Sequence, residues 1–218
     1  MFNNKFIVAF EGNHGSGKTT QCNKLCDYLV REGLRCRYIK PSIAMPSENM
    51  LTEIKKNCDD ALFVDFKRSI RIYETSKAFY EELTANSEHE IIVLDRYKYT
   101  GKAVLNINNA HNYLHELLVD WLPTPDVLFY LEIDSEVAMS QIISRGEKLR
   151  KHDNVDSLRE MSDGFENVLK NVDCSFYKID AAKPIEFISD LVVIGVTSAI
   201  KNNSNISLYR KGKFQDND

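Results

Sequence analysis

A glycine-rich segment near the amino terminus constrains the fold more than any other feature of this chain. The segment is Gly12-Asn13-His14-Gly15-Ser16-Gly17-Lys18-Thr19-Thr20, which fits the pattern G-x-x-x-x-G-K-[ST] and directly follows the apolar run FIVAF. A strand that ends in glycines and opens into a helix directs successive backbone N–H groups at one point, and the helix N-terminus adds positive potential there. The sequence therefore predicts a phosphate-binding P-loop.

The side chains of this loop indicate what it binds. Lys18 would reach the β- and γ-phosphates of a nucleoside triphosphate, and the Thr19 hydroxyl would complete the coordination of a Mg²⁺ ion. The glycines allow the backbone to approach a phosphate without a clash from a Cβ atom. We therefore expect ATP and Mg²⁺ as cofactors, bound by Asn13, His14, Gly15, Ser16, Gly17, Lys18, Thr19 and Thr20.

Apolar runs of strand length alternate with segments of helical length along the chain. The runs lie at Phe6–Phe10, Arg35–Ile39, Ile91–Leu94, Val127–Ile133 and Ser175–Ile179. The helical segments begin near Lys18, Asp59, His111, Ser135, Ser157 and Pro184. Such alternation favours a parallel sheet with helices on both faces. The prediction is an α/β fold of the P-loop NTPase type, with three layers, α/β/α, and a five-stranded parallel sheet.

Length and composition favour one globular domain. The chain has 218 residues, of which 43% are hydrophobic and 28% charged, and no Gly/Ser- or Pro-rich stretch divides it. These values are close to the averages for soluble proteins, so a sizeable core is available. We expect one domain over residues 1–200 and a polar, flexible tail over residues 201–218.

The charge balance and the cysteines exclude several classes of partner and compartment. A net charge of −4 argues against broad electrostatic binding to nucleic acid or to an anionic membrane. No signal-like segment opens the sequence, and no apolar stretch approaches the length of a membrane span. The five cysteines contain no C-x-x-C pair, which suits reduced thiols. We expect a cytoplasmic protein.

A second polar signature follows the apolar run Ile91–Leu94, where Asp95-Arg96-Tyr97 begins the next loop. Ligands bind at the carboxyl edge of a parallel sheet, where this carboxylate and guanidinium would emerge. Asp95 could hold Mg²⁺ directly or through water, and Arg96 could fork onto the oxygens of an acceptor phosphate. A structural Asp-Arg pair at the end of a strand is the alternative.

From Phe6 to about Val193, the chain resembles the thymidylate kinase family. FEGNHGSGKTTQ is similar to that family's FEG…GKTTQ opening, and Asp95-Arg96-Tyr97 with Thr100 and Ala103 matches its D-R-Y-x-x-[ST]-x-x-A segment. Three later segments also agree: Pro125-Asp126-Val127 through Leu131-Glu132-Ile133, Val137-Ala138 with Arg145-Gly146, and Ile179-Asp180-Ala181 followed by Pro184-Ile185-Glu186.

The resemblance implies a fold of five parallel strands, ATP- and Mg²⁺-dependent phosphoryl transfer to a nucleoside monophosphate, and a homodimer. It assigns Lys18 and Thr19 to the P-loop, Asp95 to the metal side, and Arg96 to the acceptor phosphate. Phe63 falls where the family stacks an aromatic ring on the base, although a core phenylalanine is the alternative. The substrate-binding set is His14, Lys40, Phe63, Lys67, Arg71, Arg96 and Thr100.

Three departures from the family pattern concern the acceptor. His14 stands where the family has an acidic residue that touches the acceptor sugar. Ile39-Lys40-Pro41-Ser42 replaces the family's R-E-P-G, so that a carboxylate becomes Lys40. The family's base-reading arginine would fall on Lys67, with Arg68 and Arg71 nearby. The charge around the acceptor therefore differs from that of the family, and the sequence does not establish that the acceptor base is thymine.

A basic segment, Arg145-Gly146-Glu147-Lys148-Leu149-Arg150-Lys151, occupies the place of the family's mobile lid over ATP, which we expect around residues 145–156. Arg145 and Arg150 are the candidates for stabilising charge on the transferred phosphoryl group. Taken without the family, a solvated basic loop is the alternative. The catalytic set is Lys18, Asp95, Arg96, Arg145 and Arg150, and the metal set is Thr19 and Asp95.

His111 and His115 have a spacing that can bind zinc, but HNYLH lacks the glutamate of H-E-x-x-H and no third ligand is evident, so no metal site is expected there. Trp121 belongs to an apolar face that is either core or dimer interface.

The leading hypothesis is a nucleoside monophosphate kinase that acts on a dTMP-like acceptor. One alternative is a nucleoside or other small-molecule kinase, in which Glu11 or Asp95 would be the carboxylate base. The other is an inactive, nucleotide-binding regulatory protein that lost phosphoryl transfer through the changes at His14 and Lys40.

Overall fold

The computed structural model describes residues 5–40, 48–57, 59–85, 90–107, 113–146, 148–150 and 153–202. The predicted tail, apart from its first two residues, and the residues Pro41, Ser42, His111, Glu147 and Lys151 therefore lie outside the described part.

A five-stranded parallel sheet forms the centre of the fold. Its strands are β1 (Phe6–Gly12), β2 (Cys36–Ile39), β3 (Ile91–Asp95), β4 (Val127–Glu132) and β5 (Ser175–Asp180). Their order is β2-β3-β1-β4-β5, and every neighbouring pair is parallel. The predicted α/β fold with five parallel strands is therefore confirmed.

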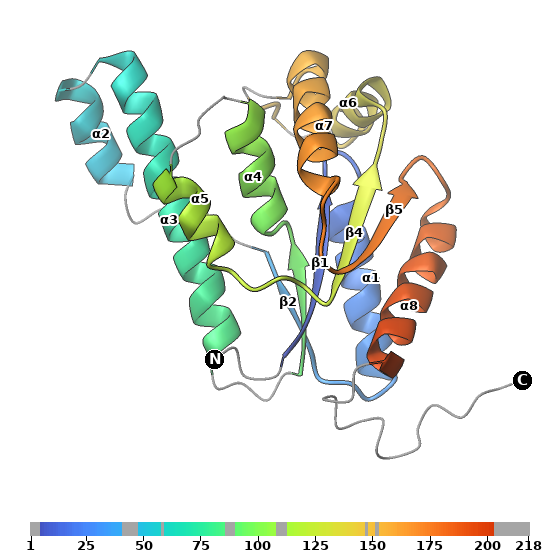
Figure 1. Cartoon of the computed structure of the whole chain (residues 1–218). Coiled ribbons are helices and arrows are strands. Elements are labelled where there is room, and N and C mark those ends of the chain that lie inside the picture. The colour runs from blue at the N-terminus through green and yellow to red at the C-terminus, as the bar shows by residue number, and fades with distance from the viewer. Residues whose placement is uncertain are drawn as a thin grey trace, which may run out of the picture.

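Helices cover both faces of this sheet (Figure 1). In the described residues they are α1 (Lys18–Arg31), α2 (Glu48–Asn57), α3 (Asp60–Thr84), α4 (Lys98–Ile107), α5 (Tyr113–Asp120), α6 (Ser135–Ser144), α7 (Val155–Leu169) and α8 (Ile185–Asn202). α1 and α8 contribute side chains to the core on one face, and α3, α4 and α7 to the core on the other. The three layers are those predicted. No helix in this part of the chain is long and apolar enough to cross a membrane.

Strand β1 shows why the sheet is central. All seven of its residues are buried, with Phe6, Val8 and Phe10 in the core on the α1 side and Ile7 and Ala9 in the core on the opposite side. Because successive side chains of a strand point to opposite faces, a continuous apolar run fits only a strand that is covered on both faces. β1 ends in the glycine-rich loop, so the core fixes where that loop begins.

Two helices, α2 and α4, were not predicted from the sequence. α4 has the sequence KYTGKAVLNI, in which Thr100 and Gly101 are weak helix formers and Lys98 is buried. The Lys98 ammonium donates a hydrogen bond to the carbonyl oxygen of Leu122 at 2.7 Å, so a polar residue occupies an inward position and hides the amphipathic pattern. Helices α1 and α6 begin at the predicted residues, Lys18 and Ser135.

Helices α4 and α7 cross closely at Gly164. A Cβ atom at this position would lie 2.9 Å from Cγ1 of Ile107 and 3.0 Å from the carbonyl oxygen of Ala103. The carbonyl belongs to the backbone of α4 and cannot move aside without shifting that helix. A side chain larger than hydrogen would force the two helices apart.

We therefore expect Gly164→Val to lower the free energy of unfolding by about 2 kcal/mol, because overpacking a tight helix crossing costs roughly this much. The control is Asp163→Val, on the exposed side of the same helix turn, which should cost less than about 1 kcal/mol. Urea unfolding of both variants measures the difference. Equal losses in the two variants would contradict the close crossing.

Candidate functional site

The glycine-rich loop joins β1 to α1 and needs glycine at two positions for lack of space. Gly12 and Gly15 have φ angles of 141° and 87°. A Cβ atom at Gly12 would lie 2.5 Å from the carbonyl oxygen of Leu131, and one at Gly15 would lie 2.6 Å from that of Ala138. Backbone conformation and crowding therefore both require glycine here. The loop is wedged against the end of β4 and against α6.

The Lys18 side chain folds back across this loop. Its Nζ atom donates to the carbonyl oxygen of Asn13 at 2.5 Å and to Oγ of Ser16 at 3.1 Å. Burial lowers the pKa of Lys18 well below its ordinary value, and the charge of Arg96 lowers it further, whereas Asp95 and Glu11 oppose the shift. A buried cation held by two neutral oxygens lacks a direct anionic partner, which an anion in the loop would supply.

The N-terminus of α1 offers donors to such an anion. Its N-cap residue is Gly17, with φ 83°, and no side chain caps the helix. The first N–H groups of a helix have no partner within the helix, and they carry partial positive charge. A Cβ atom at Gly17 would meet nothing within 4 Å, so the space beside it is open. The loop therefore fits a phosphate group in both charge and shape.

Two oxygen atoms suited to a metal lie next to the loop. The Thr19 hydroxyl donates to Oδ2 of Asp95 at 2.5 Å, and Asp95 is the last residue of β3. The Tyr38 hydroxyl donates to the same Oδ2 at 3.1 Å. Burial opposes ionisation of Asp95, but the Thr19 hydrogen bond and the charges of Lys18 and Lys40 hold its pKa below the ordinary value. A hydroxyl and a carboxylate are the hard oxygen ligands that Mg²⁺ accepts.

The described residues contain no group of three or more His, Cys, Asp or Glu side chains that could hold a metal ion.

Arg96 is held in a strained conformation beside the loop. Its φ of 73° is the one positive value among the non-glycine residues that the structure describes. Nη1 of Arg96 donates to the carbonyl oxygen of Gly12 at 3.2 Å and lies 3.4 Å from Oγ1 of Thr100. Strain of this kind persists only where neighbouring contacts enforce it, and it is common at functional sites. The guanidinium is thereby fixed at the base of the P-loop.

The contacts that enforce this turn come from Glu11. Its fully buried carboxylate accepts hydrogen bonds from the backbone N–H groups of Tyr97 and Thr100, both at 3.0 Å, and from the Thr100 hydroxyl. Glu11 therefore ties the end of β1 to the residues that follow Arg96 at the start of α4. Burial raises the pKa of Glu11 to about 7, although the Thr100 hydrogen bonds and the charge of Arg96 lower it.

His14 and Asn13 contact residues far along the chain, at Asp153 and in α7. Nδ1 of His14 lies 2.7 Å from Oδ1 of Asp153, whose Oδ2 accepts from the backbone N–H of Arg150 at 2.8 Å. Nδ2 of Asn13 donates to the Leu158 carbonyl oxygen at 2.9 Å and to the Ser162 hydroxyl at 2.7 Å. The side chains of the loop thus link it to Asp153 and to α7. The pKa of Arg96 is lowered, chiefly by burial and also by the charge of Arg150, although the charges of Glu11 and Asp95 raise it.

The remaining predicted residues lie in separate places. Phe63, Lys67 and Arg71 are spaced by four along α3, so they share one face of that helix. Phe63 is half-buried, and the ammonium of Lys55 lies 5.8 Å from its ring centroid. Arg145 caps the C-terminus of α6 and, like Arg150 and Thr20, is exposed. Trp121 is exposed but stacks on Tyr80 of α3.

Three residues with a part in this geometry, Glu11, Tyr38 and Asp153, were absent from the predicted site. The sequence held a signal for Glu11, because a carboxylate that directly follows a buried apolar run must have partners. The sequence nevertheless suggested Glu11 only as a possible base. Tyr38 and Asp153 had none, because their partners Asp95 and His14 are distant in sequence.

Comparison with known proteins agrees with this geometry. The family model for thymidylate kinase matches residues 10–192. A probable thymidylate kinase of Archaeoglobus fulgidus is 26% identical over 203 residues, which cover 91% of this chain and 100% of the relative. A probable thymidylate kinase of Saccharolobus solfataricus is 24% identical, covering 81% of this chain and 89% of its own. The thymidylate kinase of Bacillus velezensis is 23% identical, with 89% and 96% covered.

The pKa of Glu11 predicts a dependence of stability on pH. The group titrates at about 7 when folded, above the ordinary value of 4.5, so its contribution is fully present below about pH 4.5 and is lost as the pH rises through 7. Between about pH 5 and pH 8 the wild type should lose about 2.5 kcal/mol of unfolding free energy relative to Glu11→Gln, which cannot ionise.

Urea unfolding at several pH values measures both proteins. The amide also changes hydrogen bonding, but that change adds an offset that does not vary with pH. Parallel stability profiles for wild type and variant would show that Glu11 titrates normally.

Proposed function

The chain belongs to the thymidylate kinase family and is a nucleoside monophosphate kinase, and from that premise we propose that it transfers the γ-phosphoryl group of ATP to a dTMP-like monophosphate. When bound, ATP supplies the phosphoryl group and Mg²⁺ neutralises charge on the phosphate oxygens. The other steps of the proposal concern the chain's own residues.

The observation that carries the proposal is the arrangement around Lys18. Its buried ammonium lies inside the loop, 2.5 Å from the Asn13 carbonyl oxygen, beside an uncapped helix N-terminus. Triphosphate oxygens would replace these neutral acceptors and give the cation an anionic partner. We propose that residues 13–20 hold the triphosphate in this way, and that Thr19 and Asp95 hold Mg²⁺.

Arg96 is proposed to bind the acceptor phosphate. Glu11 and Thr100 fix the turn that carries it, so its guanidinium would bind without first becoming ordered. Because a monophosphate oxygen is already an anion, no strong base is needed. Catalysis then consists of holding the two phosphates in line and stabilising the charge that spreads over the transferred group.

Two further groups of residues complete the proposed site. Phe63, Lys67 and Arg71 share one face of α3 and are proposed to contact the base, with Lys40 and His14 near the acceptor. Arg145 and Arg150, in the lid around residues 145–156, are proposed to stabilise the transferred phosphoryl group. The bond from His14 to Asp153 supports this role for the lid, since Asp153 also holds the backbone of Arg150.

We further propose a cytoplasmic homodimer with one catalytic domain over residues 1–200. The cysteines that the structure describes are free thiols, which suits a reducing compartment. Large apolar side chains are exposed on α3 and next to α5, among them Phe66, Tyr73 and Trp121, and they are candidates for the dimer contact. The net charge of −4 argues against nucleic acid as a partner.

The proposal predicts release of ADP from ATP and Mg²⁺ in the presence of dTMP, and a loss of at least about a hundredfold in turnover for Lys18→Ala. Lys24→Ala is the matched control, because Lys24 lies on the same helix but pairs with Glu186 on α8. The assay should include other nucleoside monophosphates and nucleosides.

Turnover on a different monophosphate alone would reject dTMP and make His14 and Lys40 the first candidates for specificity. Turnover on nucleosides alone would favour the alternative kinase class. Bound ATP without turnover on any acceptor would reject the assignment.

A further inference from the structure

The ammonium of Lys40 lies within 3.4 Å of both oxygen atoms proposed for the metal. Lys40 follows β2, and its Nζ is 3.1 Å from Oγ1 of Thr19 and 3.4 Å from Oδ2 of Asp95. The Lys40 side chain is 55% exposed, whereas that of Asp95 is 2% exposed. A cation of the chain itself thus stands beside the ligands that a Mg²⁺ ion would use.

The hydrogen bonds around these oxygens are consistent with that position. The Thr19 hydroxyl donates a hydrogen bond to Asp95, so the lone pairs of the Thr19 oxygen can accept a hydrogen bond from Lys40. Oδ2 of Asp95 also accepts from the Tyr38 hydroxyl. The oxygen lone pairs that a metal would require are therefore directed at an ammonium group, and two cations cannot share this space without repulsion.

We propose that Lys40 is a tethered cation that occupies the metal side of the site and gives way when the metal–nucleotide complex binds. It keeps Thr19 and Asp95 together in the free protein, and it lowers the affinity for divalent cations. This inference rests on the proposed function, because it concerns the proposed metal ligands.

The position of Lys40 allows such a displacement. More than half of its side chain is in contact with solvent, so water can solvate the ammonium when it moves away from Asp95. The flexible four-carbon stem lets the ammonium move away without any change in β2. Where the family's R-E-P-G segment has a carboxylate, this chain has a cation, so the local charge differs by two.

Binding of Mn²⁺, followed by the electron paramagnetic resonance of the free ion, tests the proposal without an activity assay. The full chain is titrated in the presence of a non-hydrolysable ATP analogue. We expect Lys40→Met to bind Mn²⁺ with a dissociation constant lower than wild type by roughly three- to tenfold, because a competing charge is lost. Lys24→Met removes the same charge from an α1 residue paired with Glu186 and should match wild type.

Each other result rejects the proposal. Equal or weaker binding by Lys40→Met would show that Lys40 does not compete with the metal. If none of the three proteins showed saturable Mn²⁺ binding, that result would reject the metal site itself, and with it any role of Lys40 there.

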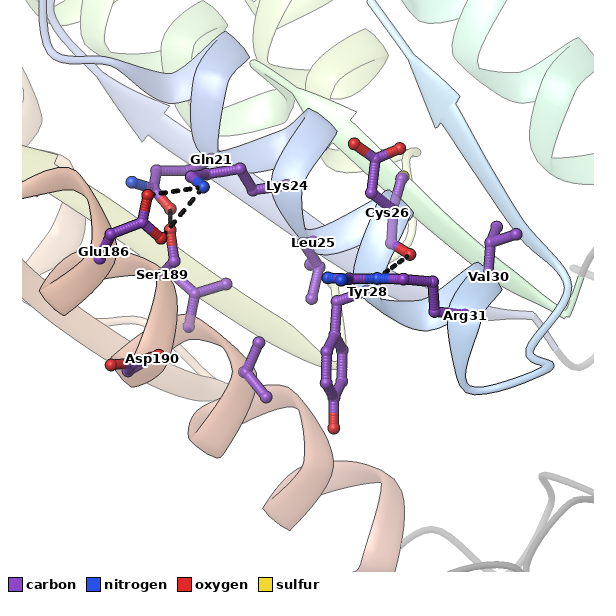
Figure 2. A pocket seen from close by; sticks show the side chains of 13 residues that line it. Gln21, Lys24, Leu25, Cys26, Tyr28, Val30, Arg31, Glu186, Ser189 and Asp190 are labelled. Carbon is purple, nitrogen blue, oxygen red and sulfur yellow. Dashed lines mark hydrogen bonds and ion pairs between the residues drawn. The ribbon is translucent and has the colours of Figure 1, made fainter.

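A separate observation concerns two cysteines away from the phosphate loop. Sγ of Cys26, on α1, lies 2.9 Å from Sγ of Cys36, on β2. Both residues are free thiols and partly buried. Cys26 also lines a groove of about 680 Å³ between α1 and α8, which Figure 2 shows from close by. One residue of the pair therefore borders a space that a small molecule can enter.

We infer that Cys26 and Cys36 form a dithiol that closes to a disulfide by exchange with a low-molecular-weight disulfide such as oxidised glutathione. Cys26 attacks a glutathione sulfur, one glutathione leaves as a thiol, and Cys36 then displaces the second. Two protein thiols are oxidised, and the glutathione disulfide is reduced to two thiols. Cys26 lines the groove, so the first attack falls to this residue.

Intact mass and peptide mapping after treatment with oxidised glutathione test this inference. The wild type should lose two hydrogen masses and yield a Cys26–Cys36 cross-linked peptide. Cys26→Ser should not, while Cys174→Ser, which changes a partly buried thiol elsewhere, should behave like wild type. A lasting glutathione adduct without a cross-link, or a disulfide at other cysteines, would overturn the inference.

Discussion

The buried carboxylate of Glu11 is the interaction on which the rest of the site depends. It lies inside a strand whose residues are all buried, where an ionised group is costly, and three hydrogen bonds from Tyr97 and Thr100 offset that cost. The same bonds hold Arg96 at a φ of 73°, which no apolar contact would enforce. Together with the hydrogen bond from the Arg96 backbone N–H to the Phe10 carbonyl oxygen at 2.9 Å, the Glu11 side chain fixes the phosphate loop and the Arg96 turn relative to each other.

Parallel pairing explains how distant segments meet at this edge. β1 and β3 are adjacent, with Phe10 opposite Asp95, so the residues that follow each strand emerge side by side. The helix that follows β1 brings Thr19 to Asp95, and β2, on the other side of β3, brings Tyr38 and Lys40 to the same carboxylate. Backbone topology thus gathers the polar groups, and short side-chain contacts complete the arrangement.

The sequence predicted the features of the fold and site that depend on residues close together in the chain. Apolar runs located all five strands, and the spacing of glycines with Lys18 and Thr19 located the loop, because both signals lie within a few neighbouring residues. It missed α4, where the buried Lys98 breaks the apolar pattern, and α2, whose residues are mostly polar. It also missed the direction of His14, because Asp153 is 139 positions away and only the folded chain brings the two together.

That contact changes the meaning of the substitution at His14. Read from the sequence, the replacement of an acidic residue by histidine altered the charge near the acceptor. In the structure, His14 binds the buried carboxylate of Asp153, so a carboxylate remains beside the loop but comes from a distant part of the chain. The charge of Lys40 faces the carboxylate of Asp95, but that carboxylate also interacts with Lys18 and Tyr38. Of the two departures, Lys40 is therefore the one that leaves additional positive charge where phosphates would bind.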